Sequence, residues 1–486
     1  MVEQSAEHLH CHRALAVVYS GGVPVSRRIH FIGIGGTGLS AIARVLLEQG
    51  EQVTGSDREY SPLAQAVEAA GARVYRGHSP DYVQGADVVI RSSAIPDEHP
   101  EVEAARKAGI PVLKRVDFLK QLLAGRDVIA IAGSHGKTTT TSMTAWVLSA
   151  LGQKPGFVAG SVVENLGVNA AAGESALFVI EADEYDYMFL GLYPYLAVVT
   201  NVEHDHPDLF PTFEAFYAAF ESFARQVRPD GALLVCADDA GSQALGAQME
   251  GEGARVLRYA VEGQGAEYRA VEISPNVIGG FDFTALRPQG APQRVRLSVP
   301  GRHNVANALA VLAVCDRLGL DWTAVAEALT AFRGSGRRFD VRGEAGGVVV
   351  VDDYAHHPTE IRATLQAARS RYPQRRIVAV WQPHTYTRTR ALYADFLQAF
   401  ADADVVAVTD VYRAREPFDP DFSVAALVEA MPHPAAHYTA SLEETVDFLL
   451  GILRPGDVLL VLSAGDAPQV SAVVLEALPA VMEERG

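Results

Sequence analysis

A short glycine-containing segment holds the residues best suited to phosphate chemistry. The apolar run 128–132 is followed by the segment GSHGKTT, in the order of a strand, a tight turn and a helix start. Backbone N–H groups of such a turn cradle phosphates, a lysine reaches the terminal oxygens, and a threonine hydroxyl can bind Mg²⁺. The spacing is GxxGKT, shorter than the full GxxxxGK[ST] pattern, and a plain glycine turn is the alternative. The predicted phosphate-binding residues are Gly133, Ser134, His135, Gly136, Lys137, Thr138 and Thr139.

A second glycine turn lies nearer the N-terminus. Gly35, Gly36 and Gly38 follow a predicted strand and begin a predicted helix, and Asp57 comes about 20 residues later. Read alone, this is the dinucleotide fingerprint, in which a diphosphate lies at a helix N-terminus and the acidic residue meets a ribose. An NAD-dependent dehydrogenase is therefore one alternative, and a plain strand-to-helix turn is another. A second phosphate loop later in the chain disfavours the dehydrogenase.

Two acidic segments end two further predicted strands. Glu181, Asp183 and Glu184 follow the apolar run 177–180, and the segment TNVEHDHPD, which includes His206, ends the run 197–200. Because the carboxyl ends of parallel strands meet at one edge of a sheet, both segments should lie beside the phosphate turn. Carboxylate and imidazole groups beside Thr138 would hold Mg²⁺ against the phosphates. A solvated acidic loop is the alternative for either segment alone.

The elements that must position these motifs alternate along the whole chain. Short runs rich in Val and Ile are separated by amphipathic stretches, which is the α/β pattern of parallel sheets covered by helices. A chain of 486 residues exceeds one ordinary core and suggests three domains. We predict an extension at 1–26 and domains at 27–125, 126–338 and 339–486, the second ending in a basic, glycine-rich hinge at 333–338. The clearest predicted strands are 29–34, 128–132, 377–381, 405–408 and 458–462, and the clearest helix is 38–49.

The composition excludes several functional classes. A formal net charge of -18 argues against nucleic acid or an anionic membrane as the main partner. We expect a cytoplasmic protein without membrane insertion, because no long uncharged apolar run occurs and residues 1–12 lack the order of a secretory signal. Cys11, Cys236 and Cys315 are widely separated, so we expect neither a disulfide framework nor a thiolate metal site.

The order of the motifs resembles the Mur ligase family. The matching segments are HFIGIGGTGLSAIA, GSDREYS, AGSHGKTTTT, EADEYDYMFL, AVVTNVEHDHPD, GRHNVANALA, GSGRRFD, VDDYAHHPTEIRATL, QPHTYTRTRALY and SAGD, which span about residues 28–466. The resemblance implies a Rossmann-like domain that holds UDP rather than NAD, a central P-loop-type ATPase domain and a C-terminal Rossmann-like domain that brings in an amino acid. The motifs are most similar to the branch that joins L-alanine to UDP-N-acetylmuramate.

The resemblance also implies roles for individual residues in each domain. The UDP substrate would be held by Gly35, Gly36, Thr37, Gly38, Asp57, Ser92 and Ser93. ATP would contact the phosphate loop together with His303, Asn304, Arg338 and Asp353, and Mg²⁺ would be bound by Thr138, Glu181 and His206. The amino acid would meet Tyr354, His356 and Arg388. The expected catalytic residues are Lys137, Glu181, His206, Arg338 and His356.

The implied reaction is amide formation through an acyl-phosphate in peptidoglycan precursor synthesis, with ATP and Mg²⁺ as cofactors and a monomer or weak homodimer as the working unit. A ligase that adds a recycled tripeptide to the same sugar nucleotide is the close alternative, and a nucleotide-sensing module without turnover is a non-enzymatic one. The chain departs from the family pattern at one position on the amino-acid side and, more mildly, in other segments. Thr385 stands where many members have arginine, and the segment 410–416 reads DVYRARE.

Overall fold

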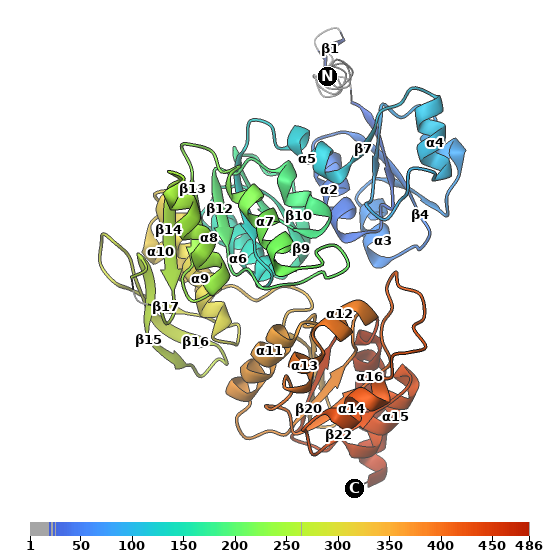
Figure 1. Cartoon of the computed structure of the whole chain (residues 1–486), viewed down its shortest axis with the longest axis vertical. Coiled ribbons are helices and arrows are strands. Elements are labelled where there is room, and N and C mark those ends of the chain that lie inside the picture. Colours follow the sequence, from blue (N-terminus) through green and yellow to red (C-terminus); the bar gives the residue numbers. More distant parts are fainter. Residues whose placement is uncertain (1–18, 21–22, 25, 264, 486) are drawn as a thin grey trace.

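The computed structural model describes residues 19–20, 23–24, 26–263 and 265–485. They form three α/β domains in chain order, and Figure 1 shows the first in blue, the central one from cyan to yellow and the third in orange and red. Most of the expected extension over residues 1–26 lies outside the described residues, although β1 (Tyr19–Ser20) and β2 (Val23–Pro24) pair antiparallel within it. No helix in the described ranges is both long and apolar enough to cross a membrane.

The first domain is a parallel sheet with the strand order β5-β4-β3-β6-β7. Its strands are β3 (Arg28–Ile32), β4 (Gln52–Asp57), β5 (Arg73–Arg76), β6 (Val88–Arg91) and β7 (Val112–Lys114). Its helices are α2 (Thr37–Glu48), α3 (Pro62–Ala69), η1 (Pro80–Val83), α4 (Pro100–Lys107) and α5 (Arg115–Leu122). Gly33 has a φ of +86°, in the left-handed region that favours glycine, and it turns the chain from β3 toward α2. The predicted strand 29–34 and helix 38–49 correspond to β3 and α2.

The central domain holds a sheet with the order β10-β9-β11-β8-β12-β13-β14-β15-β16-β17. Its strands are β8 (Asp127–Ala132), β9 (Gly156–Val163), β10 (Val168–Ala171), β11 (Leu177–Glu181), β12 (Leu196–Val199), β13 (Ala232–Cys236), β14 (Val256–Ala260), β15 (Tyr268–Pro275), β16 (Phe281–Leu286) and β17 (Gln293–Arg296). Its helices are α6 (Lys137–Ala150), η2 (Tyr185–Gly191), α7 (Phe213–Ala224), α8 (Ala240–Gly251), α9 (His303–Arg317) and α10 (Trp322–Thr330). The middle is parallel as predicted, but β10 at one edge and β16 and β17 at the other are antiparallel additions that the sequence did not indicate.

The third domain holds a sheet with the order β18-β19-β23-β20-β21-β22, parallel except for β18. Its strands are β18 (Asp340–Ala345), β19 (Val348–Asp353), β20 (Ile377–Trp381), β21 (Val405–Val408), β22 (Ala436–Tyr438) and β23 (Val458–Leu462). Its helices are α11 (Pro358–Arg371), α12 (Tyr386–Ala391), α13 (Tyr393–Leu397), α14 (Val424–Ala430), α15 (Leu442–Ile452) and α16 (Pro468–Arg485). Strands β20, β21 and β23 have the predicted bounds.

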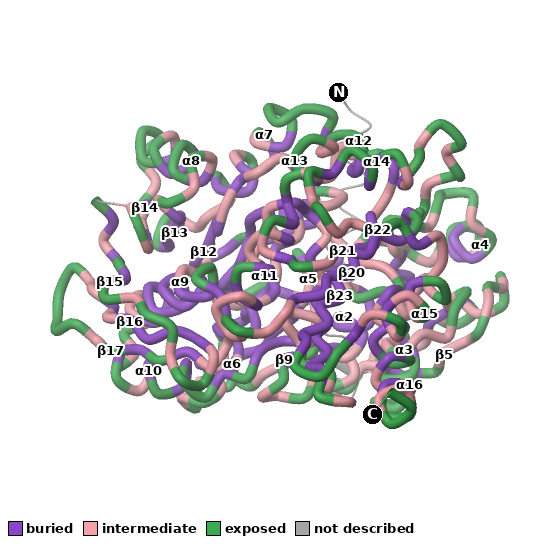
Figure 2. Tube along the Cα trace, turned by 90° about the horizontal axis from the view of Figure 1, so that it is seen from below, coloured by how far each residue is buried: buried purple, intermediate pink, exposed green. Residues whose placement is uncertain are grey.

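The central strands are buried on both faces. In β8, Val128 and Ala130 belong to one hydrophobic cluster, while Ile129 and Ile131 belong to the cluster on the opposite face. Successive side chains of a strand point to opposite faces, so a continuous apolar run is what a strand covered by helices on both sides requires. Figure 2 shows such buried strands, β12, β20 and β23 among them, inside a periphery of exposed loops.

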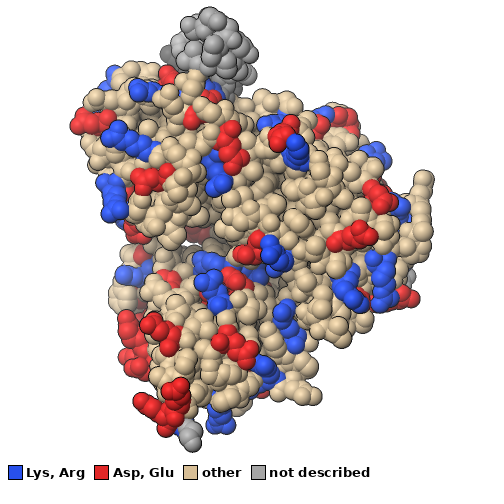
Figure 3. All heavy atoms as spheres, turned by 180° about the vertical axis from the view of Figure 1, so that it is seen from behind, with Lys and Arg blue, Asp and Glu red and all other residues tan. Residues whose placement is uncertain are grey.

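The two domain interfaces differ in kind. The first and central domains share one hydrophobic cluster, in which Ile42 and Val45 of α2 join Val158 of β9 and Ala170 of β10. The third domain has separate clusters on the two faces of its own sheet. It meets the central domain through charged and polar side chains, and Figure 3 shows Lys, Arg, Asp and Glu beside the recess between the lobes. The phosphate turn lies at this polar interface.

Candidate active site

The phosphate turn joins β8 to α6 through two glycines with left-handed backbone. Gly133 has a φ of +133°, and a Cβ there would overlap the hydroxyl of Thr200. Gly136, the N-cap residue of α6, has a φ of +82°, and a Cβ there would come within 2.9 Å of the Asn307 side chain. Only glycine satisfies both constraints without strain. The turn therefore brings the start of α6, with Lys137, to the carboxyl edge of the sheet.

Lys137 is held by the buried carboxylate of Glu184, which belongs to the acidic segment predicted to lie beside the phosphate turn. Its Nζ lies 2.8 and 3.0 Å from the two oxygens of Glu184 and donates to the carbonyl of Gly133 at 2.6 Å. Burial lowers the pKa of Lys137, but the carboxylates of Glu184 and Asp183 outweigh it and raise the pKa above its ordinary value. The lysine is therefore charged and is positioned before any phosphate enters.

The side chains expected to bind a metal begin beside this lysine. Thr138 donates its hydroxyl to Glu181 at 3.0 Å, and the other oxygen of Glu181 accepts from the backbone N–H of Gly160 at 2.7 Å. Burial raises the pKa of Glu181, the Lys137 charge opposes this, and the Asp183 carboxylate adds to the rise. A buried carboxylate whose negative charge is not balanced by neighbouring cations is suited to bind a metal cation.

His206 lies on the other side of Glu184. Its Nε2 is 3.5 Å from a Glu184 oxygen and 3.7 Å from an oxygen of Asp205, and its backbone φ is +53°. Burial lowers the pKa of His206, but Asp205 and Glu184 outweigh it and raise the pKa. Lys137, Glu184 and His206 thus form one contiguous group of titratable side chains at the carboxyl ends of β11 and β12.

Arg388 of α12 reaches this group from the third domain. Its Nε donates to Asp205 at 2.8 Å, and both side chains are nearly fully buried, with 4% and 5% of their surfaces exposed. Its guanidinium also lies 2.9 Å from Nδ1 of His384 and 3.4 Å from Nδ1 of His206. Arg388 therefore forms a buried ion pair across the domain interface.

Glu360, in the first turn of α11, joins three predicted site residues. One oxygen lies 3.5 Å from Arg338 and 3.4 Å from Nδ1 of His135, and the other lies 3.3 Å from Nδ1 of His356. Burial would raise the pKa of Glu360, but the His356 and His135 rings hold it well below its usual range. His357 caps α11 and Pro358 follows at its first position, which places Glu360 at the positive helix end.

The amino-acid residues expected from the resemblance lie together around His356. The rings of Tyr354 and His356 are 5.3 Å apart, those of His356 and His384 are 5.5 Å apart, and the Arg338 guanidinium lies 5.1 Å from the Tyr354 ring centre. Nδ1 of His356 is 2.9 Å from the carbonyl of Tyr354, which can only accept, so this nitrogen donates. Burial and the Arg388 charge lower the pKa of His356 to about 3, so its Nε2 keeps a free lone pair.

A cavity of about 310 Å³ lies between the phosphate turn and the third domain. The predicted ATP-binding residues on its wall are His135, Gly136, Thr139, His303, Asn304, Arg338 and Asp353. Asp353 accepts from the backbone N–H groups of Phe339 and Ala355, and burial raises its pKa to about 6. Asn307, on α9 one turn after Asn304, also lines the cavity and went unnoticed in the sequence.

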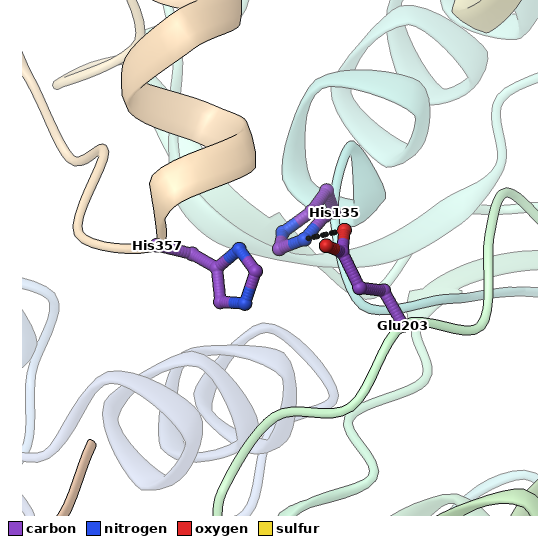
Figure 4. A group of neighbouring side chains, drawn as sticks. All are labelled: His135, Glu203 and His357. Carbon is purple, nitrogen blue, oxygen red and sulfur yellow. Dashed lines mark hydrogen bonds and ion pairs between the residues drawn. The ribbon is translucent and has the colours of Figure 1, made fainter. Parts of the chain in front are cut away.

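Three neighbouring side chains of the interface could in principle bind a metal. His135, Glu203 and His357 offer donor atoms that all lie within 4.8 Å of one another (Figure 4). Burial lowers the pKa of His135, but Glu203 and Glu360 outweigh it and raise the pKa to about 9, so this ring is protonated. Nδ1 of His357 already accepts from the backbone N–H of Thr359 at 3.3 Å. We interpret the cluster as a charge-paired contact between domains.

Residues 33–38, which form the glycine turn of the first domain, include no Lys, Arg or His. Gly35 donates its N–H to Asp57 at 2.8 Å, and the other oxygen of Asp57 accepts from Glu59, so this carboxylate holds the turn. Ser92 accepts from the backbone of Ala94. Gly36 and Thr37 are exposed, as is Ser93. Arg115, beside Gly38, pairs with Asp183 at 3.2 Å and so connects this turn to the central site.

Four site residues received no individual role from the sequence, three of them because their partners are distant in the chain. Glu184, Asp205 and Glu360 all lie inside quoted motifs, but what each one pairs with depends on the fold. Glu360 had the clearest local signal, since an acidic residue in the first turn of a helix that begins with His-Pro favours the positive helix end. Asn307 repeats Asn304 at a spacing of three, which places both on one helix face.

Sequence comparisons agree with this architecture domain by domain. Residues 28–127 match the family described as "Mur ligase family, catalytic domain", residues 131–315 the "Mur ligase middle domain", and residues 337–465 the "Mur ligase, glutamate ligase domain". A UDP-N-acetylmuramate–L-alanine ligase of Roseiflexus sp. is 43% identical over 461 residues, covering 92% of this chain and 98% of that relative.

Solved structures of Mur ligases superpose on the chain along nearly its whole length. A UDP-N-acetylmuramate–alanine ligase of Thermotoga maritima superposes with a TM-score of 0.79 at 29% identity, covering 93% of this chain and 99% of that one. A murein peptide ligase of Psychrobacter arcticus superposes with a TM-score of 0.70 at 26% identity and the same coverage. With three domain matches and a relative of this identity along nearly its whole length, the chain belongs to the Mur ligase family.

Proposed function

We propose that the chain joins L-alanine to the lactyl carboxylate of UDP-N-acetylmuramate and consumes ATP, giving UDP-N-acetylmuramoyl-L-alanine, ADP and phosphate. This proposal rests on one observation: predicted phosphate-binding groups and predicted amino-acid-binding groups lie together at the interface between the central and third domains. The central domain supplies the phosphate turn with Lys137, and the third domain supplies Arg388 and His356. The full-length relative with this activity in its name supports the choice of substrates.

The chemistry explains why these groups must meet. A carboxylate is a poor electrophile, so one of its oxygens must become a leaving group before an amine can attack. Transfer of the γ-phosphoryl group gives an acyl-phosphate, and the amine then displaces phosphate through a tetrahedral intermediate. The protein must align the reactants and neutralise charge. Lys137 is suited to meet the transferring phosphoryl group, and Arg338 can meet the nucleotide from the hinge side of the cavity.

The proposed Mg²⁺ site fits the residues present. Thr138 and Glu181 offer oxygen ligands of the kind Mg²⁺ prefers, and the raised pKa of the buried Glu181 indicates room for a positive charge. His206 would complete the set from the neighbouring strand end. When bound, Mg²⁺ would neutralise charge on the ATP phosphates. Lys137, which is already tethered to Glu184, would orient those phosphates from the turn.

On the amino-acid side, we propose that Arg388 attracts the L-alanine carboxylate and that the ring of His356 accepts a hydrogen bond from its ammonium group. Nε2 of His356 keeps a lone pair because Nδ1 donates to the Tyr354 carbonyl. In the first domain, the exposed Gly36 and Thr37 at the start of α2 would receive the diphosphate of UDP. Use of ATP fits a cytoplasmic enzyme, and a monomer or weak homodimer remains our expectation.

Phosphate release tests the proposal directly. Purified protein with ATP, Mg²⁺ and UDP-N-acetylmuramate is given L-alanine, the tripeptide L-alanyl-γ-D-glutamyl-meso-diaminopimelate, or neither. We expect release with L-alanine and formation of the corresponding UDP product by mass spectrometry. Release with the tripeptide alone would assign the chain to peptide recycling instead. No release with either acceptor would contradict a ligase of this substrate class.

A further inference from the structure

The proposed reaction requires a cation for the carboxylate of the incoming amino acid, and the charge of Arg388 is already balanced. Its guanidinium bonds Asp205 at 2.8 Å and His384 at 2.9 Å, inside the protein. An anion arriving at this arginine meets an ion pair with no net charge. A second cation nearby would supply the missing attraction.

The loop 410–416, after β21, runs beside the segment that leads into α12. Tyr412 donates its backbone N–H to Pro383 at 2.8 Å, and its carbonyl accepts from Thr385 at 3.0 Å. At the end of the loop, the Glu416 carboxylate accepts from the backbone N–H groups of Tyr386 and Thr387. The loop is therefore fastened at both ends to the helix that carries Arg388.

Arg415 extends from this loop to the central domain. Ala414 has a φ of +53°, an uncommon value for a residue with a Cβ, at the bend just before it. Nη1 of Arg415 lies 3.5 Å from the Tyr185 hydroxyl, and its guanidinium lies 5.8 Å from the centre of that ring. The Tyr185 ring in turn meets the His206 ring edge to face at 5.0 Å. One aromatic ring thus separates Arg415 from the histidine that Arg388 also contacts.

Arg415 forms no direct ion pair among the described residues, although the Tyr185 hydroxyl that it contacts also donates to the Asp208 carboxylate at 3.3 Å. The Arg415 side chain is exposed. Its bond to Tyr185 is long, so a carboxylate could replace it with a shorter, charge-assisted one. At the neighbouring position 385 the side chain is a threonine, which caps α12 through its hydroxyl and brings no charge.

We propose that Arg415 binds the carboxylate of the amino-acid substrate, with Tyr185 as the platform that orients its guanidinium. This inference rests on the proposed function and deepens it by naming a specificity residue on a loop outside the family motifs matched above. Arg388 would supply hydrogen bonds to this carboxylate, and Arg415 would add the net positive charge that the paired Arg388 and Asp205 lack together. The substrate class selected is an amino acid with a free α-carboxylate.

The test compares L-alanine with L-alaninamide, which has the same amine and methyl group but no carboxylate. For the wild-type protein, Arg415→Ala and Arg413→Ala, phosphate release is measured as a function of each acceptor at saturating ATP and UDP-N-acetylmuramate. Arg413 is the matched control, because it is an exposed arginine of the same loop. We expect Arg415→Ala to raise the KM for L-alanine about tenfold and to leave kcat/KM for L-alaninamide unchanged.

The outcomes separate this inference from the proposed function. Wild-type protein without L-alanine-dependent release would overturn the proposed function, and this inference with it. Active wild-type protein with the same KM for L-alanine in Arg415→Ala would overturn the inference alone. So would an equal loss for L-alanine and L-alaninamide, since that pattern reports a general effect of the loop. Arg415→Lys should recover part of the affinity, because it restores the charge without the planar fork.

Discussion

The two domain interfaces of this chain differ in the side chains that dominate them, although the mainly apolar one also holds the Arg115–Asp183 ion pair. Between the first and central domains, α2 packs its apolar face on β9 and β10 within one continuous core. Between the central and third domains, the contacts are the Arg388–Asp205 ion pair, the Thr359–Glu203 hydrogen bond and the Glu360 carboxylate. Large apolar interfaces hold domains in a fixed relation, whereas polar ones permit relative motion.

The polar interface between the central and third domains is therefore where we expect both the reaction and domain motion to occur. A reaction that moves a phosphoryl group needs cations and carboxylates near each other, and these groups are tolerated at an interface that can open to water. The first domain needs only to bind a diphosphate, which neutral backbone donors achieve. We therefore expect substitutions at the polar interface to affect turnover, and substitutions in the first-domain turn to affect the binding of one substrate.

The largest effect is expected from Lys137→Ala. Removing the cation from the transferring phosphoryl group should lower kcat by about 10²- to 10³-fold. The substitution also leaves the buried Glu184 without its main partner, so the melting temperature should fall. Adding Glu184→Gln should restore stability but not turnover, which separates the two roles. Lys137→Ala protein with more than about a tenth of wild-type phosphate release would refute the assignment.

Arg388→Ala should have the next largest effect. We expect the KM for L-alanine to rise about 10- to 150-fold, from the loss of roughly 1.5 to 3 kcal/mol of charge-assisted bonding. The KM values for ATP and UDP-N-acetylmuramate should barely change. Asp205→Asn is the control, because it breaks the ion pair and keeps the arginine. If both variants raise all three constants equally, Arg388 serves only to join the domains.

The parts of the fold that the sequence predicted are those determined locally. Strands β20, β21 and β23 are apolar runs buried on both faces, so burial itself marks their bounds. The antiparallel strands β16 and β17 mix polar with apolar residues instead of forming a continuous apolar run. Their existence depends on the neighbour to which they pair, which no local pattern specifies.

The same distinction holds in the site. The phosphate turn was recognisable because two glycines, a lysine and a threonine lie within a few residues of one another. The Arg388–Asp205 pair joins positions 183 residues apart, and His135 meets Glu360 across two domains. The order of the motifs predicted that these segments share one active site. Which charged side chains pair with each other depends on how the third domain packs against the central domain.

The polar interface should lose stability at alkaline pH through His135. Its folded-state pKa of about 9 lies above the ordinary 6.5, so its stabilising contribution is complete below pH 6.5 and is lost as the pH rises through 9. The loss is on the order of 2 kcal/mol, and thermal unfolding in chelator-treated buffer measures it. His135→Gln should be less stable than wild type at pH 6.5 and nearly equal to it at pH 10. A constant difference across this range would exclude His135 as the titrating group. His433→Asn serves as the control, because the His433 ring contacts the Ala403 carbonyl within the third domain and lies outside the polar interface.

The smallest effect on activity is expected in the first-domain turn, where alanine substitutions at two adjacent glycines should have different consequences. A Cβ on Gly35 would come within 2.8 Å of the Ser61 hydroxyl and 2.9 Å of Asp57, so Gly35→Ala must distort the turn itself. Gly36 has an ordinary φ of -73°, is exposed, and has its nearest atom at 3.4 Å, so the free protein accommodates alanine there.

Gly36→Ala should therefore keep the wild-type melting temperature, while the added methyl group obstructs the approach of a diphosphate to the start of α2. We expect the KM for UDP-N-acetylmuramate to rise about tenfold and the KM for ATP to stay constant, because ATP occupies the other interface. Gly35→Ala should raise the same constant and also lower the melting temperature. An unchanged KM for UDP-N-acetylmuramate in Gly36→Ala would show that the diphosphate does not approach this turn, and the assignment of substrates to the two interfaces would have to be revised.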